Sequence, residues 1–210
     1  MTEEEAHAWI VARFGEDAHD RLSRYAALLT EEAARQNLIA ASTLPTLWSR
    51  HIVDSAQLLD HAPVPVGARR WIDIGSGAGL PGLVIALASD WRVRLVEPRR
   101  LRVAFLDHCI AALGLGDRVS VAAAKVEAVE RDGVAAAVIS ARAVAALPRL
   151  IASAVHLADA DTIWLLPKGA GAQSEVADAR RSWQGVFHVK PSAVDPASGI
   201  VLASRIARRR

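Results

Sequence analysis

Glycines and one acidic residue form the part of the sequence best suited to bind a small molecule. The segment Asp73 to Gly82 reads DIGSGAGLPG; the apolar run Trp71 to Ile74 leads into it and a predicted helix, Leu80 to Ala88, follows. Glycine allows a tight turn with no Cβ in the way, and the next helix N-terminus then faces a ligand over the loop. Glu97 ends the following predicted strand, 20 residues after Gly77. An open α/β sheet places an acid there to bind both hydroxyls of a ribose, so the pair predicts an adenosine-containing cofactor.

Two cofactors are compatible with this loop. The segment from Gly77 to Gly82 satisfies G-x-G-x-x-G, so an NAD-dependent oxidoreductase is one alternative. The turn already begins at Gly75, however, which leaves Leu80 where the third dinucleotide glycine would stand. We also expect the Asp73 carboxylate beside the ligand, where it would repel a pyrophosphate and suit a cation. S-adenosylmethionine is a sulfonium cation without phosphate, so the electrostatics favour it. The predicted cofactor-binding residues of this region are Asp73, Gly75, Gly77, Gly79, Leu80 and Glu97.

The elements that must position the loop change character near residue 66. Residues 1–66 read as three helices, over 2–14, 18–36 and 42–60, and two prolines and a glycine then break the pattern. From residue 67, strands and helices alternate, which indicates parallel βαβ units. The expected strands are 71–74, 93–96, 119–122, 135–139, 162–166, 186–189 and 200–203, with helices over 80–88, 99–113, 148–157 and 171–182. We therefore predict an α/β fold, in which a Rossmann-like, mostly parallel doubly wound sheet over 67–210 and an N-terminal helical extension over 1–66 form one compact unit.

Composition narrows the class of protein. The 210 residues are 52% hydrophobic and 23% charged, which is typical of a globular chain. The single cysteine, Cys109, excludes an internal disulfide and a cysteine-rich zinc site, and we predict no metal. No apolar run reaches the roughly 18 residues of a membrane span, and the N-terminus is acidic where a secretory signal would be basic. These features predict a cytoplasmic protein that does not associate with membranes.

Charge is unevenly distributed along the chain. Residues 1–70 carry 10 acidic and 7 basic side chains, a net of −3, whereas residues 71–210 carry 13 and 18, a net of +5. The basic residues cluster in two places: Arg92, Arg94, Arg99, Arg100 and Arg102, and then Arg205, Arg208, Arg209 and Arg210. Such a surface attracts phosphates. GC-rich coding of an alanine-rich chain would give the same excess of arginine, so charge alone does not select a nucleic-acid partner.

Five stretches together resemble a known family. They are Asn37-Leu38, Leu47 to Ser55, Asp73 to Gly82, Ser140-Ala141-Arg142-Ala143 and Pro167-Lys168-Gly169, and they span most of residues 30–170. In this order they resemble the bacterial 16S ribosomal RNA guanine-N7 methyltransferases, the ribosomal RNA small subunit methyltransferase G or glucose-inhibited division protein B family. The D-x-G-x-G-x-G spelling of the glycine loop is similar to the first motif of Rossmann-like class I S-adenosylmethionine-dependent methyltransferases.

The resemblance implies roles for individual residues. It implies that Gly75, Gly77 and Leu80 carry the cofactor, that Glu97 binds its ribose, and that Val126 and Glu127 contact its adenine. Arg142 would lie near both the cofactor and the target base and position them, and Lys168 would contact a phosphate or the base. The remaining candidates for substrate binding are Asn37, Arg50 and His51.

Plainer explanations exist for some of these residues. Arg50 and Asp54 could form an i,i+4 surface ion pair, and His51 could be a hydrogen-bonded structural histidine. The sequence also departs from the family pattern at two points. Glu97 stands where many relatives have Asp, and Ala143-Val144 follows the arginine where an aromatic residue is frequent. No residue is therefore assigned to stack on the base.

The expected reaction is direct in-line methyl transfer to guanine N7 in the 530 loop of 16S rRNA, on the small ribosomal subunit, by a monomer. Guanine N7 has a lone pair and no proton to remove, so the transfer needs alignment and no general base. Cys109 is misplaced for pyrimidine C5 chemistry, and the Asn/Asp-Pro-Pro-aromatic run of amine methyltransferases is absent after the fourth predicted strand. Arg142 is expected to hold the O6 side, a phosphate or the cofactor. The helical extension would act as a lid or face the RNA. The alternatives are a small-molecule methyltransferase and the NAD-dependent oxidoreductase.

Overall fold

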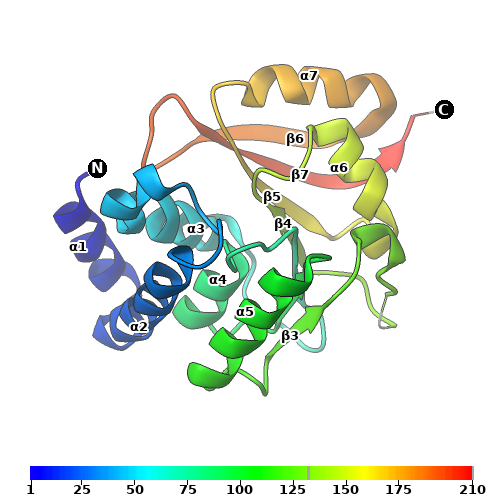
Figure 1. The fold of residues 1–210 in the computed structure, drawn as a ribbon. Helices are drawn as coiled ribbons and strands as arrows, with labels where there is room; N and C mark the ends of the chain where they lie inside the picture. The colour runs from blue at the N-terminus through cyan, green and yellow to red at the C-terminus, as the bar shows by residue number, and fades with distance from the viewer. Residues whose placement is uncertain (132, 210) are drawn as a thin grey trace.

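A seven-stranded sheet forms the centre of the computed structural model, which describes residues 1–131 and 133–209. The strand order is β3-β2-β1-β4-β5-β7-β6, and β1 to β5 are parallel, whereas β7 runs antiparallel to β5 and β6. The strands are β1 (Trp71–Ile74), β2 (Val93–Val96), β3 (Val119–Ala122), β4 (Val138–Ala141), β5 (Ile163–Lys168), β6 (Trp183–Pro191) and β7 (Gly199–Arg208). The α-helices are α1 (Glu3–Phe14), α2 (Glu16–Ala33), α3 (Asp54–Ala56), α4 (Gly82–Ala88), α5 (Arg100–Ala112), α6 (Leu147–Ala154) and α7 (Ala172–Ser182). The predicted α/β class and parallel sheet are confirmed (Figure 1).

Helices cover both faces of the sheet, and each face has its own core. Successive residues of a strand point to opposite faces, so Trp71 packs with α2, α4 and α5 while Ile72 and Ile74 pack with α6 and α7. Figure 1 shows these two helical layers on either side of the strands. Because both faces of the central strands are buried, their short sequences are almost continuously apolar, as expected for a parallel sheet.

The N-terminal helices share the first of these cores. Ile10 of α1 and Leu22 and Leu29 of α2 are fully buried in the same cluster as Leu83 of α4. Tyr25, also fully buried, donates a hydrogen bond from its hydroxyl to the Ala78 carbonyl of the glycine loop, at 2.7 Å. The helical extension is therefore packed directly behind the loop that the sequence singled out, and α2 ends at Ala33, before the predicted residue 36.

The prediction of a single α-helix over residues 42–60 is wrong. The chain forms a 3₁₀-helix η1 (Ala41–Thr46), a π-helix η2 (Trp48–Val53), the single turn α3 and a second 3₁₀-helix η3 (Gln57–His61). The Glu3 carboxylate of α1 accepts the N–H groups of Trp48 and Ser49, both at 2.8 Å, and so caps the π-helix from outside. Helical periodicity alone cannot anticipate a cap that lies 45 residues away, and π-turns are frequent at functional sites.

Further element boundaries differ from prediction. The strand expected over 135–139 is β4 at 138–141, because it pairs residue by residue with β1, Trp71 with Val138 and Ile74 with Ala141. Arg142 therefore follows directly after the strand end. The final strands are longer than predicted because β6 and β7 pair with each other as an edge hairpin. In the described ranges, no helix combines the length and apolar character needed to cross a membrane.

Candidate functional site

A cavity of about 890 Å³ opens at the carboxyl ends of the parallel strands. Its walls come from the glycine loop after β1, the loop after β4, the end of β5, the π-helix and the loop between β6 and β7. Open α/β sheets bind ligands at this edge, and the volume is that of a small-molecule site. The cavity thus joins segments from the whole length of the chain.

The glycine loop presents backbone to the cavity. Gly75 has φ +66°, and a Cβ there would lie 2.6 Å from Val144 Cγ2, so only glycine lets the two loops meet. Gly77 has φ +56°, a backbone conformation that favours glycine, and a Cβ there would lie in ordinary contact with Arg102 Nη1 at 3.6 Å and with the Gly75 carbonyl oxygen at 3.7 Å. Leu80 also lines the cavity, whereas Gly79 packs against Leu83 and does not line it.

Asp73 does not lie beside the ligand space, contrary to our expectation. It is fully buried, accepts hydrogen bonds from Ser140 Oγ at 2.7 Å and Gly82 N at 3.2 Å, and does not line the cavity. The pleat of β1 points its side chain toward α4, and the β1–β4 register places Ser140 beside it. Burial raises the pKa of Asp73 to about 6, against the effect of these hydrogen bonds. The residue holds the loop and helix α4 together, so its charge does not select a cationic ligand over a pyrophosphate.

Glu97 lies directly under the glycine loop. It is 2% exposed and accepts hydrogen bonds from Gly77 N at 3.0 Å and from Arg99 N at 2.9 Å, with Arg102 Nη1 at 3.9 Å. Each oxygen of an ionised carboxylate can accept two hydrogen bonds. The carboxylate that was predicted to bind a ribose therefore adjoins Gly77, which lines the cavity, but Glu97 does not line the cavity itself. Each carboxylate oxygen retains acceptor capacity.

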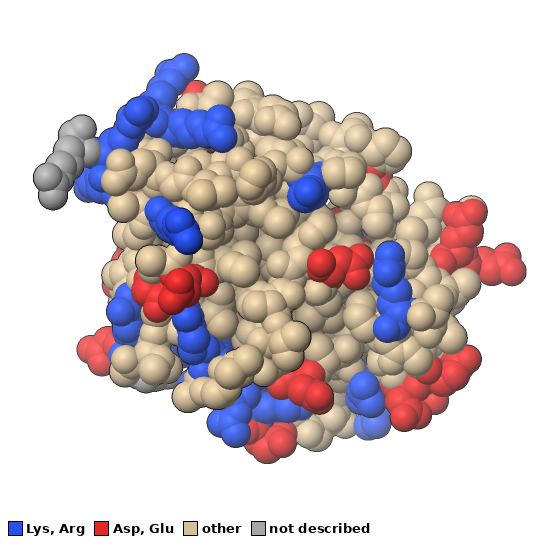
Figure 2. Space-filling model, turned by 180° about the vertical axis from the view of Figure 1, so that it is seen from behind, with Lys and Arg blue, Asp and Glu red and all other residues tan. Residues whose placement is uncertain are grey.

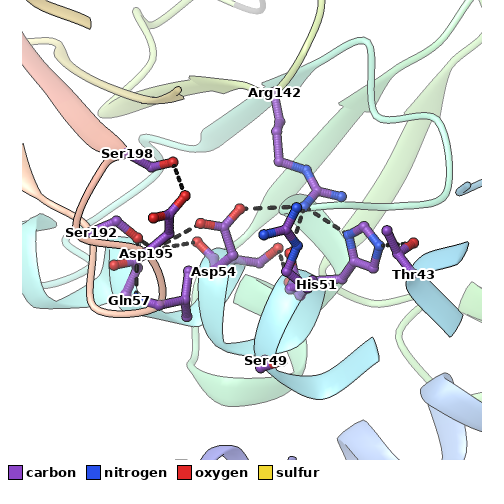
Figure 3. Close-up of polar contacts among 12 residues, drawn as sticks. Thr43, Ser49, His51, Asp54, Gln57, Arg142, Ser192, Asp195 and Ser198 are labelled. Carbon is purple, nitrogen blue, oxygen red and sulfur yellow. Dashed lines mark hydrogen bonds and ion pairs between the residues drawn. The ribbon is translucent and has the colours of Figure 1, made fainter. Parts of the chain in front are cut away.

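Arg142, in the loop after β4, lines the cavity and contacts the π-helix. Its Nη1 lies 3.0 Å from His51 Nδ1, 3.4 Å from Asp54 Oδ2 and 3.4 Å from the Arg50 carbonyl (Figure 3). Asp54 therefore pairs with Arg142, across 88 residues of sequence, and the predicted i,i+4 pair with Arg50 is replaced. The π-helix produces this arrangement, because Arg50, His51 and Asp54 line the cavity from its last turn and the residue that follows.

The protonation of His51 follows from its two neighbours. Arginine can only donate, so Nδ1 accepts from Arg142 and the ring proton sits on Nε2, which donates to Thr43 Oγ1 at 2.8 Å. Burial, together with the nearby Arg142 and Arg50 charges, lowers the pKa of His51 to about 4. His51 is thus a neutral acceptor that orients Arg142. It has the predicted structural role and also lines the cavity.

We expect the His51 titration to report this contact. The ring should stay neutral with its proton on Nε2 through pH 6 and titrate near pH 4. Between the unfolded value of about 6.5 and 4, the unfolded state binds a proton that the native state does not, so the free energy of unfolding should fall as pH falls through that window. Nitrogen-15 histidine NMR measures the titration midpoint and the position of the ring proton, with His51→Gln to assign the signal. A midpoint near 6.5, or a proton on Nδ1, would rule the contact out.

Lys168 is held at the far side of the cavity. Its Nζ lies 2.8 Å from Glu175 Oε2 and donates to the Ala145 carbonyl at 2.9 Å, and Glu175 Oε2 also accepts the Leu147 N–H at 2.7 Å. These contacts fasten the loop after β4 to β5 and α7. The predicted contact of Lys168 with a phosphate or base stays a prediction. In such a contact the ammonium group would bind the RNA in addition to Glu175 and the Ala145 carbonyl.

Three further predicted residues do not line the cavity. Val126 is buried at the start of the short helix η4 (Val126–Ala128), and Glu127 follows it on the surface. Asn37 is exposed, while its neighbours Leu38 and Ile39 do line the cavity. The adenine contact of Val126 and Glu127 and the substrate contact of Asn37 remain predictions.

Several wall residues were not predicted to be site residues. They are Thr43, Asp54, Ala143, Val144, Val194, Asp195 and Ser198. Ala143 has φ +55°, an uncommon backbone for alanine, and the exposed Val144 follows it against Gly75. Asp54 and Ala143 stand in stretches that carry the family resemblance, whereas Thr43, Val194, Asp195 and Ser198 depend on which loops the fold brings together.

The first basic cluster is split between the two ends of β2, because Arg92 precedes this strand whereas Arg99, Arg100 and Arg102 follow it. Arg99 and Arg100 follow the carboxyl end of β2 and are exposed near the cavity, which Arg102 lines. Arg208 pairs with Trp183, whereas the β7 residue beside Lys168 at the cavity is Gly199, so the C-terminal arginines lie at the opposite end. Figure 2 shows basic side chains gathered around the C-terminus; Arg210 itself lies outside the described residues. Over the described ranges, no group of three or more His, Cys, Asp or Glu side chains is arranged to hold a metal ion.

Solved structures show a similar fold. The chain matches the glycopeptide N-methyltransferase MtfA complexed with S-adenosylmethionine at TM-score 0.60 and 12% identity, covering 73% of this chain and 93% of that one. It matches a variant of MtNAS in complex with S-adenosylmethionine at TM-score 0.58 and 20% identity, covering 90% and 76%. The predicted Rossmann-like class I fold is confirmed.

Sequence comparison identifies the family. Residues 18–197 match the family model described as GidB, rRNA small subunit methyltransferase G. A protein of that name from Rhizorhabdus wittichii is 47% identical over 100% of this chain and 95% of its own length, and one from Novosphingobium aromaticivorans is 46% identical over 100% and 91%. The chain therefore belongs to the ribosomal RNA small subunit methyltransferase G family.

Proposed function

We propose that the protein transfers a methyl group from S-adenosylmethionine to guanine N7 in the 530 loop of 16S rRNA. The observation that carries this proposal is that Arg142 lines the same cavity as Gly77, which Glu97 adjoins, in a member of this family. The same proposal includes a monomeric enzyme in the cytoplasm, acting on the small ribosomal subunit.

The residues present fit S-adenosylmethionine. Gly75 and Gly77 have no side chains and line the cavity, which leaves a cradle of bare backbone, and Glu97 adjoins it with lone pairs for two hydroxyls. Gly75, Gly77 and Leu80 would hold the cofactor and Glu97 its ribose. When bound, S-adenosylmethionine supplies a sulfonium methyl group to an attacking lone pair.

The protein's own task is then alignment and exclusion of water. Guanine N7 loses no proton as it takes the methyl group, so none of the residues in the cavity has to act as a base. The product base is cationic, so a second cation in line with N7 would oppose the reaction. Arg142, turned aside by Asp54 and His51, is placed to hold O6, a phosphate or the cofactor instead. Holding the partners at about 3–3.5 Å in line is sufficient for large acceleration.

RNA binding should depend on the arginines at the cavity end. We expect Arg99→Gln with Arg100→Gln to weaken RNA binding and to reduce the slope of log affinity against log salt by about 0.7 for each phosphate that is no longer neutralised. Arg208→Gln with Arg209→Gln, at the opposite end of the sheet, should leave both unchanged. Binding measured at several salt concentrations tests this, and equal effects of the two pairs would contradict it.

The reaction itself can be tested directly. The protein is incubated with methyl-labelled S-adenosylmethionine and small ribosomal subunits from cells that lack the modification, and the RNA is then reduced and cleaved with aniline at 7-methylguanine. A single cut in the 530 loop is the expected result. Label elsewhere in the RNA would overturn the target. Absence of label, with cofactor binding confirmed separately, would overturn RNA methylation in favour of a small-molecule acceptor.

A further inference from the structure

Gln57 is a buried polar residue that does not itself line the cavity. It is 3% exposed, and its carboxamide contacts two separate segments. Nε2 donates to Asp54 Oδ1 at 2.9 Å and lies 3.1 Å from the Asp54 carbonyl and 3.2 Å from Ser192 Oγ. Oε1 accepts the Ala193 N–H at 2.8 Å. Gln57 thus joins the helical extension to the loop between β6 and β7, across 136 residues of sequence.

The other end of this network is Arg142. Asp54 receives Gln57 on Oδ1 and faces Arg142 with Oδ2 at 3.4 Å, so its carboxylate is held from both sides. Figure 3 shows the line of contacts from Ser192 through Gln57, Asp54 and Arg142 to His51 and Thr43. The inner members of the line have a partner on either side, which restricts their rotamers.

The loop that Gln57 holds is itself a wall of the cavity. Val194, Asp195 and Ser198 line it. Ser192 Oγ accepts the Val194 N–H at 3.2 Å, and Ser198 Oγ donates to Asp195 Oδ2 at 2.8 Å. The contact between Gln57 and Ser192 therefore acts at the base of an internally bonded loop, and movement of Gln57 would move that wall.

We propose that Gln57 is a positioning residue, which through Asp54 sets the placement of Arg142 and at the same time anchors the 192–198 loop. This inference rests on the proposed function, because Arg142 acts in that reaction. The carboxamide suits both tasks: its N–H groups donate to a carboxylate and a hydroxyl while its oxygen accepts from backbone. Neither a carboxylate nor an aliphatic side chain at this position can do all three.

Asp54 provides a readout that a merely structural role would not move. The charged and titratable groups facing it are Arg142 from the loop after β4 and Arg50 and His51 from the π-helix, with Asp195 in the adjoining wall. Burial raises the pKa of Asp54, while Arg142 and the Gln57 hydrogen bond lower it. Loss of the Gln57 donor should raise this pKa further, so Arg142 would lose its ionised partner at a higher pH.

The experiment compares three variants with the wild-type enzyme in methylation of small ribosomal subunits. We expect Gln57→Leu to lower kcat about tenfold, to leave the Kd for S-adenosylmethionine within about twofold, and to move the acid limb of the kcat–pH profile to higher pH. Gln57→Glu keeps an acceptor for Ala193 but places a second carboxylate beside Asp54, so its acid limb should move furthest. Ser192→Ala removes only the loop contact and should raise KM for RNA without moving that limb. Gln173→Leu, an exposed glutamine of α7, is the matched control.

Two results would overturn the proposal. The first is that Gln57→Leu and Gln57→Glu both fold but leave the acid limb of the kcat–pH profile where it is in the wild-type enzyme. The second is that Gln173→Leu moves this limb as far as the Gln57 variants do. If the wild-type protein does not methylate RNA, the proposed function fails, yet this link is still measurable by NMR. Gln57→Leu should then change the His51 Nδ1 signal while Gln173→Leu leaves it unchanged. If Gln57→Leu does not fold, the acid limbs of Gln57→Glu and Ser192→Ala are compared instead, and only that of Gln57→Glu should move.

Discussion

Replacement of Arg142 by alanine should lower kcat for RNA methylation about 100-fold, with the Kd for S-adenosylmethionine changed less than about threefold. The reason is geometric: His51 and Asp54 hold Arg142 in the cavity wall beside the π-helix, where it can orient the acceptor without supporting the cofactor's ribose. Single-turnover methylation and calorimetric cofactor titration measure the two quantities separately.

Two controls sharpen this result. Arg149→Ala removes an exposed arginine of α6 and should have no effect on either quantity. Arg142→Lys retains the charge but not the planar donor fork, so it should recover only part of the activity. If Arg142→Ala instead lost cofactor affinity by the whole factor while kcat at saturation held, Arg142 would belong to the cofactor site.

The opposite pattern is expected for Glu97→Ala. Charge-assisted hydrogen bonds are worth about 1.5–3 kcal/mol, so loss of the carboxylate should raise the Kd for S-adenosylmethionine about 10- to 100-fold. Glu97 also holds the Gly77 N–H at 3.0 Å, so the cradle loses an internal support at the same time. At saturating cofactor, kcat should fall no more than a few-fold.

Glu97→Asp, which keeps the carboxylate on a shorter side chain, separates the loss of charge from the change in side-chain length. Glu97→Asp keeps the charge and should retain cofactor affinity within about fivefold, as expected if one methylene is tolerated. Asp107→Ala, which removes an exposed acid of α5, is the neutral control. Unchanged cofactor affinity in Glu97→Ala would show that the ribose is held elsewhere.

The sequence by itself determined the sheet and the cofactor loop. Apolar runs of four residues, each followed by a helix, can bury both faces only in a parallel sheet, and such a sheet brings Gly77, Glu97 and Arg142 to one edge. These predictions depend on local pattern and on a general rule of topology. The family resemblance also rested on short contiguous stretches, and the comparisons confirm it.

Only the tertiary structure decided what each polar side chain contacts. The period of an α-helix paired Arg50 with Asp54, but Glu3 caps a π-helix there and Asp54 turns to Arg142. A carboxylate before a glycine loop looked like a ligand contact, but the pleat of β1 points Asp73 into the core. In each case the deciding partner lies tens of residues away in the chain, and a hydrogen bond depends on distance and angle, which residue type and spacing do not contain.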